Sequence, residues 1–169
     1  MSRDEAIALI RAGQAVGADL RGLDLSGCAL SGADLREARL SHNNLSRADL
    51  SNADLRNAYF DFATLVGANL FGANCEFTVF GGADLSEANF SGANLKRANL
   101  VGAKGYGTRF DGANLYYSRP GNADLNGASF RGADITRAIF RRANLTDADL
   151  RGATGQANFE NAELDGAQR

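Results

Sequence analysis

The sequence contains few of the residues that most often carry enzyme chemistry. It has 169 residues, with one histidine, two cysteines, one proline and no tryptophan. His42 has no histidine or cysteine beside it in the sequence, whereas a metal site needs several converging ligands. The chain also lacks the G-x-x-x-x-G-K-[ST] and G-x-G-x-x-G motifs of nucleotide-binding loops, and a Ser–His–Asp set needs a buried, oriented base. We therefore predict a protein that is not an enzyme, without catalytic residues, metal or cofactor.

Neither sign of charge is in excess. The chain carries 18 basic and 20 acidic side chains, which gives a formal net charge of −2. Domains that bind nucleic acid are usually basic, so this balance argues against nucleic acid as a partner. The chain is equally far from the strong acidity of a protein that imitates DNA.

Long apolar segments are absent as well. No stretch approaches the roughly 20 apolar residues of a membrane span. The first ten residues, MSRDEAIALI, lack the long apolar region and small-residue cleavage site of a signal peptide. Cys28 and Cys75 are therefore expected to be free, buried thiols, because disulfides are rare in reducing compartments. These features predict a cytoplasmic protein that does not contact membranes.

What the sequence does contain is a repeat of five residues. Between Arg47 and Leu70 a large apolar residue occupies every fifth position, and an alanine precedes each by two positions. We call the large residue the centre of its unit. Neither a helix, with a period of 3.6, nor a simple strand, with a period of 2, has this spacing. An internal repeat of this kind indicates a solenoid.

The same phase holds over most of the chain. Centres fall at every fifth residue from Leu20 to Leu150, which makes 27 positions. Only Cys75, Gly105 and Pro120 among them are not Leu, Ile or Phe. After Leu150 the phase slips by one residue, and the pattern continues with the centres Phe159 and Leu164.

The unit A-(D/N)-L-x-x, as in residues 48–52 (ADLSN), resembles that of the pentapeptide-repeat family, and it covers residues 18 to about 166. The resemblance implies an all-β fold, a right-handed quadrilateral parallel β-helix with four units per coil. The centre and the residue two before it would point inward. At about 4.8 Å per coil, about seven coils would form a rod roughly 35 Å long.

The N-terminus has a different pattern. Residues 2–13 predict a short helix, since Ser2 and Glu5 form an S-x-x-E capping box and Gly13 provides a stop. The alternative is a mobile terminus. We predict a capping helix within 1–16, which covers the open end of a solenoid spanning 17–169.

Several units depart from the consensus. Leu23, Cys28 and Asn43 replace inward alanines near the start. The largest departure is the segment 103–122, where Gly105 and Pro120 occupy centres and Thr108 and Ser118 replace inward alanines. A glycine centre is expected to leave a void. The segment is either a tolerated kink or a bulge that presents its tyrosines, among them Tyr106.

Outward residues 20 positions apart should stack in columns, one coil above another. The column 37, 57, 77, 97, 117, 137 alternates aromatic and cationic side chains from Phe77 onward, which suits cation–π contacts. On the adjoining side we expect outward apolar residues at positions where Asp or Asn is usual, namely Tyr59, Val79, Val101 and Ile139. Exposed apolar clusters mark partner surfaces, although stacked aromatics can simply cover the rod. Nine residues form the candidate partner surface: Tyr59, Phe77, Val79, Arg97, Tyr116, Tyr117, Arg137, Arg141 and Arg142.

Three functions fit these observations. The first is a rigid, non-catalytic scaffold that binds another protein. The second, which the family resemblance permits, is a DNA-mimicking modulator of type II topoisomerase (gyrase), although the near-neutral charge and outward arginines differ from the acidic rods usual for that role. The third is a targeting or effector module of a larger protein. We also expect that the last coil, around Phe159 and Leu164, can pair with a second copy in a homodimer.

Overall fold

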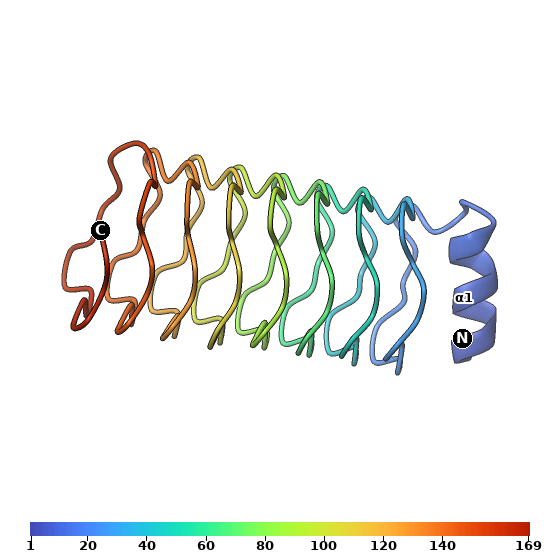
Figure 1. The fold of residues 1–169 in the computed structure, drawn as a ribbon. Coiled ribbons are helices and arrows are strands. Elements are labelled where there is room, and N and C mark those ends of the chain that lie inside the picture. The colour runs from blue at the N-terminus through green and yellow to red at the C-terminus, as the bar shows by residue number, and fades with distance from the viewer.

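The computed structural model describes residues 1–169 and begins with one helix, α1, Arg3–Arg11. Ser2 is its N-cap: the Ser2 hydroxyl accepts a hydrogen bond from the Glu5 N–H, and the Glu5 carboxylate accepts one from the Ser2 N–H. Ala6 and Ile10 are buried against the first coil. The predicted capping box and capping helix are confirmed, and the helix lies across one end of the rod (Figure 1).

The remainder of the chain is a four-sided coil, seen as a stack of similar turns in Figure 1. Each side pairs in parallel with the side 20 residues further on, as in Tyr59 with Val79 and Val79 with Asn99. Each rung is a single residue pair, because two corner residues separate successive sides. Beyond residue 139 the step shortens to 19, as in Ile139 with Asn158, which confirms the predicted phase slip.

The interior is dry and made of centres and alanines. Every Leu, Ile or Phe centre from Leu20 to Leu150 is buried, and the residues two before them are buried alanines along most of the rod. From Phe60 onward phenylalanine rings lie above one another, with Phe60–Phe80, Phe90–Phe110 and Phe110–Phe130 centroids 5.3, 5.3 and 4.9 Å apart. Each buried side chain of this size contributes about 1.5–3 kcal/mol.

Departures from alanine are absorbed without loosening the coil. Thr78 and Thr108, both fully buried, donate hydrogen bonds to the carbonyls of Leu55 and Leu85 at 2.7 and 2.8 Å. The Asn43 side-chain oxygen accepts a hydrogen bond from the Leu23 N–H at 2.9 Å. These three polar side chains each pair with a backbone group of a neighbouring coil, whereas the buried Ser118 hydroxyl and the Asn43 side-chain nitrogen have no partner.

The segment 103–122 is not bulged, and the void expected at Gly105 is absent, so of the two alternatives the structure does not support the bulge. Its rungs keep the 20-residue step, as in Lys104 with Asp124 and Asn114 with Asp134. A Cβ placed on Gly105 would lie 2.8 Å from the Leu125 Cδ2 atom and 3.0 Å from the Thr108 hydroxyl. Neighbouring side chains therefore fill the space that a larger centre would occupy, and the glycine leaves no void.

The end opposite α1 is the last coil, where the Phe159 ring stacks on Phe140 with centroids 5.2 Å apart. Both cysteines are free and buried, as predicted, and burial raises the pKa of the Cys75 thiol. No helix in the structure has the length and apolarity needed to cross a bilayer.

Candidate interaction surface

One side of the coil brings the predicted surface residues together. This side carries Tyr59, Val79, Asn99, Arg119 and Ile139 in successive coils, and together with its two corners we call it the Tyr59 face. Other sides mostly carry Asp, Asn, Ser or Thr at the equivalent position. On the Tyr59 face, 46% of Tyr59 and 38% of Ile139 remain exposed. The face therefore combines exposed apolar side chains with Asn99 and Arg119, where the other sides are mostly polar.

The first corner of the face is a ladder of alternating rings and guanidinium groups. Arg97 lies 5.4 Å from the Phe77 ring centroid and 5.9 Å from that of Tyr117, and Arg137 lies 5.1 Å from Tyr117 on its other side. These are the contacts that the 20-residue columns predicted. Arg137 also donates a hydrogen bond to the Tyr117 hydroxyl, which raises the pKa of the guanidinium.

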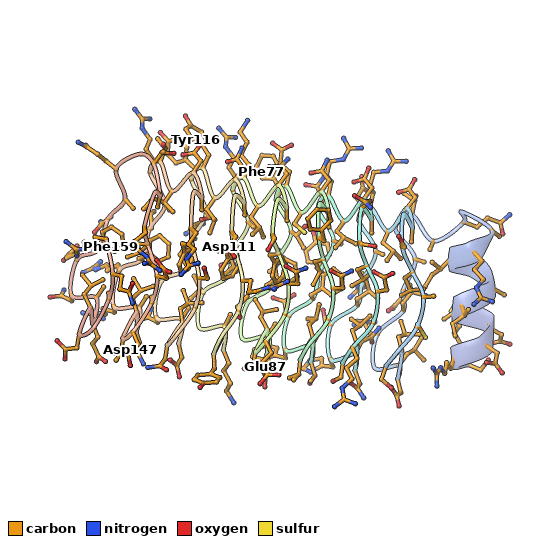
Figure 2. The ribbon with its side chains drawn as sticks, in the orientation of Figure 1. Phe77, Glu87, Asp111, Tyr116, Asp147 and Phe159 are labelled. Carbon is orange, nitrogen blue, oxygen red and sulfur yellow. The ribbon has the colours of Figure 1, made fainter.

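A second ring extends this corner. Tyr116 packs edge-on against Tyr117, with centroids 4.7 Å apart, and Lys96 lies 5.8 Å from the Tyr116 ring. Lys96 also lies 3.9 Å from the Glu76 carboxylate. Figure 2 shows Phe77 and Tyr116 along one edge of the rod, with Glu87 and Asp147 along the opposite edge. The Phe77 and Tyr116 side chains thus lie on the opposite edge of the rod from Glu87 and Asp147.

The second corner carries an aromatic residue that the sequence analysis did not single out. Phe62 is 63% exposed and stacks on His42, with ring centroids 5.4 Å apart. A Cβ on Gly82, the next residue in the column, would lie 2.6 Å from the Phe62 ring, so only glycine lets the ring lie there. The column signal was available, since residues 42, 62 and 82 are 20 positions apart.

Val101 belongs to this second corner, which corrects the prediction for its position. It was expected where Asp or Asn is usual, but it follows the centre Leu100 and lies one column away from Tyr59 and Val79. Val101 is exposed, as are Arg141 and Arg142 at the same corner. The sequence predicts a basic cluster of Arg137, Arg141 and Arg142, but Arg137 belongs to the Phe77 ladder and the other two lie across the face from it.

In the N-terminal coils, and in one unit near the C-terminus, arginines are neutralised by a simple rule. In four units an Asp lies on a side of the coil, and an Arg follows two positions later. The two side chains therefore lie next to each other and form an ion pair. Their N–O distances are 2.6 to 2.7 Å, in the pairs Asp19–Arg21, Asp34–Arg36, Asp54–Arg56 and Asp149–Arg151. The Arg21 guanidinium lowers the pKa of Asp19 to about 2. Sequence alone thus determines which of these arginines are paired.

The Tyr59 face does not follow this rule in its C-terminal half. Arg97, Arg119, Arg137 and Arg142 form no ion pair, and Arg141 lies 3.4 Å from Glu160. Cations without ion pairs occur singly on other columns, at Arg47, Lys104 and Arg109. Like charges gathered around exposed rings attract an anionic partner. Arg119, which the sequence analysis did not select, lies at the middle of this group.

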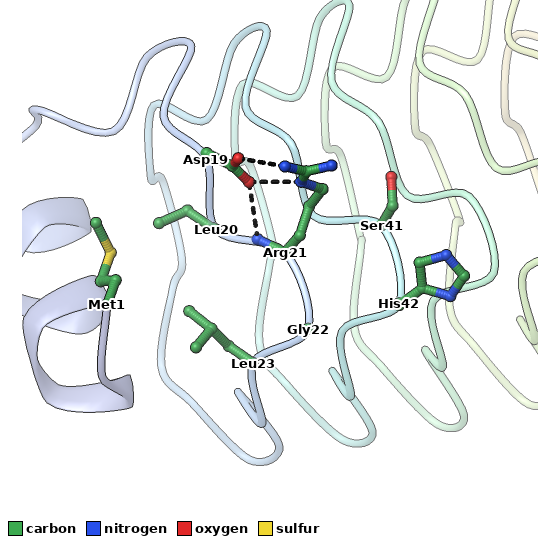
Figure 3. A pocket seen from close by; sticks show the side chains of 8 residues that line it. All are labelled: Met1, Asp19, Leu20, Arg21, Gly22, Leu23, Ser41 and His42. Carbon is green, nitrogen blue, oxygen red and sulfur yellow. Dashed lines mark hydrogen bonds and ion pairs between the residues drawn. The ribbon is translucent and has the colours of Figure 1, made fainter.

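A depression lies between α1 and the first coil. It has a volume of about 480 Å³ and is lined by Met1, Leu20, Leu23, Ser41 and the residues around Asp19 and His42 (Figure 3). Asp19 accepts hydrogen bonds from the Arg21 side chain at 2.6 and 2.7 Å, so its carboxylate is already engaged. No cluster of three or more His, Cys, Asp or Glu side chains is placed to hold a metal ion.

Comparison with known proteins agrees with this architecture. The family model for pentapeptide repeats matches eight copies, over residues 16–52, 33–70, 68–104, 83–119 and 121–152. The chain belongs to the pentapeptide-repeat family. A search of curated proteins finds no match.

Solved structures of pentapeptide-repeat proteins are similar over most of the chain. QnrB1, a plasmid-mediated fluoroquinolone resistance protein, is 22% identical with a TM-score of 0.56, over 90% of this chain and 85% of that one. HetL, involved in heterocyst differentiation regulation in the cyanobacterium Nostoc sp. strain PCC 7120, is 29% identical with a TM-score of 0.39, over 99% and 96%. A protein of the Arabidopsis thaliana thylakoid lumen is 29% identical with a TM-score of 0.46, over 76% and 72%. The predicted right-handed quadrilateral β-helix is confirmed.

Proposed function

We propose that this pentapeptide-repeat protein is a rigid, non-catalytic scaffold that binds another protein through the Tyr59 face. One observation carries the proposal: this face combines exposed rings with arginines that have no carboxylate partner. Aromatic and arginine side chains dominate the energetics of protein interfaces. Because the coils are stacked on a packed interior, the side chains are held at fixed spacing before binding, which reduces the entropy lost on association.

The ladder at the first corner is suited to this role. Arg97 already contacts the rings of both Phe77 and Tyr117, so few rotamers need to be fixed when a partner docks. Their rings and charges are desolvated further on binding, and a cation–π contact strengthens from about 0.5–1 to about 2 kcal/mol when water is removed. The same contacts that cover the rod in isolation therefore provide the centre of an interface.

Affinity capture with the intact protein tests the proposal. Wild type is compared with Phe77→Ala/Tyr117→Ala, and with the control Phe71→Ala/Tyr106→Ala, which removes two exposed rings from other corners. We expect the first variant to lose a protein that wild type and the control both retain. Equal capture by all three, or turnover of a small molecule that depends on surface residues, would contradict the proposal. Circular dichroism establishes that each variant is folded.

The gyrase alternative requires a surface that substitutes for DNA. The C-terminal half of the Tyr59 face is cationic instead, and the net charge is −2. A supercoiling assay with titrated protein distinguishes the two functions. Inhibition of gyrase, or protection of gyrase from a quinolone, would favour the alternative over the scaffold proposal.

The homodimer stays a prediction. Its support is an open depression of about 240 Å³ at the last coil, lined by Ile135, Leu150, Gly152, Ala153, Phe159 and Arg169. Apolar side chains at the end of a solenoid favour pairing with a second copy. Sedimentation velocity at several concentrations tests it, and a strict monomer throughout would contradict it.

A further inference from the structure

One backbone acceptor on the Tyr59 face has no donor. In successive coils the N–H of a centre donates to the carbonyl 19 residues further on, as Phe80 does to Asn99 and Leu100 to Arg119. Pro120 is a centre without an N–H, so the carbonyl of Ile139 receives no hydrogen bond. The rung between Arg119 and Ile139 is correspondingly missing. Every other carbonyl at the equivalent position, from Arg39 to Gln168, accepts a bond from its neighbouring coil.

Ile139 also lines a groove. The groove has a volume of about 210 Å³, and we name it the Ile139 groove after its lining residues Val101, Arg119, Gly121, Asn122, Ile139, Arg141 and Arg142. A Cβ on Gly121 would lie 3.8 Å from the Ile139 carbonyl oxygen and 3.4 Å from that of Arg141. The glycine therefore leaves this edge of the backbone uncovered by a side chain.

Ile139 stands where an Asp would pair with Arg141 in other units, and this adds to the positive charge around the groove. Where four other units have Asp two positions before Arg, this unit has Ile139 before Arg141. Arg141 is left with Glu160 at 3.4 Å, and Arg119 and Arg142 have no carboxylate. Apolar Val101 and Ile139 thus stand among three guanidinium groups with a free carbonyl between the coils.

We propose that the Ile139 groove binds an acidic, extended segment of a partner protein. A backbone N–H of the segment donates to the Ile139 carbonyl, and its Asp or Glu carboxylates pair with Arg119, Arg141 or Arg142. An extended peptide offers both groups at close spacing, whereas a phosphate backbone has no N–H to give. This inference rests on the proposed function and adds the subsite and the chemistry of the partner.

A fluorescein-labelled peptide of six glutamates, titrated by fluorescence anisotropy at low salt, tests the charges. Arg119→Gln/Arg141→Gln/Arg142→Gln should weaken binding about tenfold, the sum expected for three exposed ion pairs. The control Arg109→Gln/Arg131→Gln/Arg151→Gln removes the same charge from other sides of the rod and should change affinity less than twofold. Equal losses in the two variants, or no binding to wild type, would overturn the proposal.

The carbonyl is tested separately. Pro120→Leu introduces the usual centre residue and an N–H that pairs with Ile139, so the peptide should bind about threefold to tenfold more weakly. The same peptide with N-methylated amides should bind wild type with a similar loss, and this measurement needs no folded variant. If neither change alters affinity, the free carbonyl takes no part in binding.

Two further measurements distinguish the acidic peptide from other occupants of the groove, and this inference from the scaffold proposal on which it rests. If a twelve-residue oligothymidylate binds more tightly than the peptide, the groove is a nucleic-acid site rather than a peptide site. Self-association that the three arginine substitutions abolish would make a second copy the occupant, and either result overturns the inference. Partner capture that depends on Phe77 and Tyr117, together with absent peptide binding, would refute the groove and leave the scaffold function standing.

Discussion

Replacing Phe110 by alanine tests the packing on which the surface depends. The Phe110 ring is 1% exposed and lies 5.3 Å from Phe90 and 4.9 Å from Phe130. Core Phe→Ala changes cost about 3–5 kcal/mol, with the largest costs where the site cannot collapse. Coils are bonded on both sides of this position, so we expect the upper half of that range, about 4–5 kcal/mol. Domains of this kind have about 5–15 kcal/mol in total.

The comparison with Phe110→Leu isolates the ring. Leucine is the usual centre and restores most of the volume, so its cost should be about 1–2 kcal/mol, mainly from two lost ring contacts. Phe71→Ala, which removes a 52% exposed ring from a corner, should cost about 0.5 kcal/mol or less.

Urea unfolding followed by far-ultraviolet circular dichroism measures all three variants. The order Phe110→Ala, then Phe110→Leu, then Phe71→Ala is expected. A Phe110→Ala cost equal to that of Phe71→Ala would mean that the rings do not form a tight stack.

Three other predictions concern the cap, the broken rung and acid. Ser2→Ala removes the N-cap acceptor of α1 and should lower the free energy of unfolding by about 1 kcal/mol, measured by urea unfolding; no change would mean that the capping box does not stabilise the fold. Pro120→Leu supplies the N–H that Ile139 lacks and should raise stability by about 0.5–1.5 kcal/mol, whereas a lower melting temperature would show that the proline packs better than leucine. Hydrogen bonds from Arg36 and Arg56 lower the pKa values of Asp34 and Asp54. The two carboxylates therefore stabilise the fold fully above their unfolded pKa, near 4, and lose this effect as pH falls through their lower folded pKa values. Thermal melts should show stability decreasing from about pH 5 downward, and a flat profile would contradict this prediction.

The interior could be predicted because its pattern is periodic and unambiguous. Burying one large residue and one alanine in every five fixes which side chains point inward, and the 20-residue coil then fixes which outward residues are neighbours. The contacts from Phe77 through Arg97 to Tyr117 followed from this spacing together with the four-unit coil that the family resemblance implies. The capping helix was equally readable, since its signal lies in Ser2 and Glu5 themselves.

Features that depend on how neighbours adjust could not be predicted in the same way. The sequence suggested a void at Gly105, but the Leu125 and Thr108 side chains occupy that space. The segment 103–122 suggested a bulge, but backbone pairing between coils holds the step at 20 residues. A local deviation is suppressed because each coil is bonded to the coils above and below it, and only the hydrogen bond that Pro120 cannot donate is lost.

The architecture separates stability from recognition, and this is why a single outward residue can create a binding site. Replacing Asp by Ile at position 139 leaves the centre Phe140 and the inward Ala138 unchanged, so the interior packing is preserved. The same replacement deprives Arg141 of the partner that Arg21, Arg36, Arg56 and Arg151 have. With Pro120 one coil away, it also adds an apolar side chain beside a free carbonyl. Charge, apolar area and a hydrogen-bond acceptor thus coincide at one position because the surface of this rod varies independently of its core.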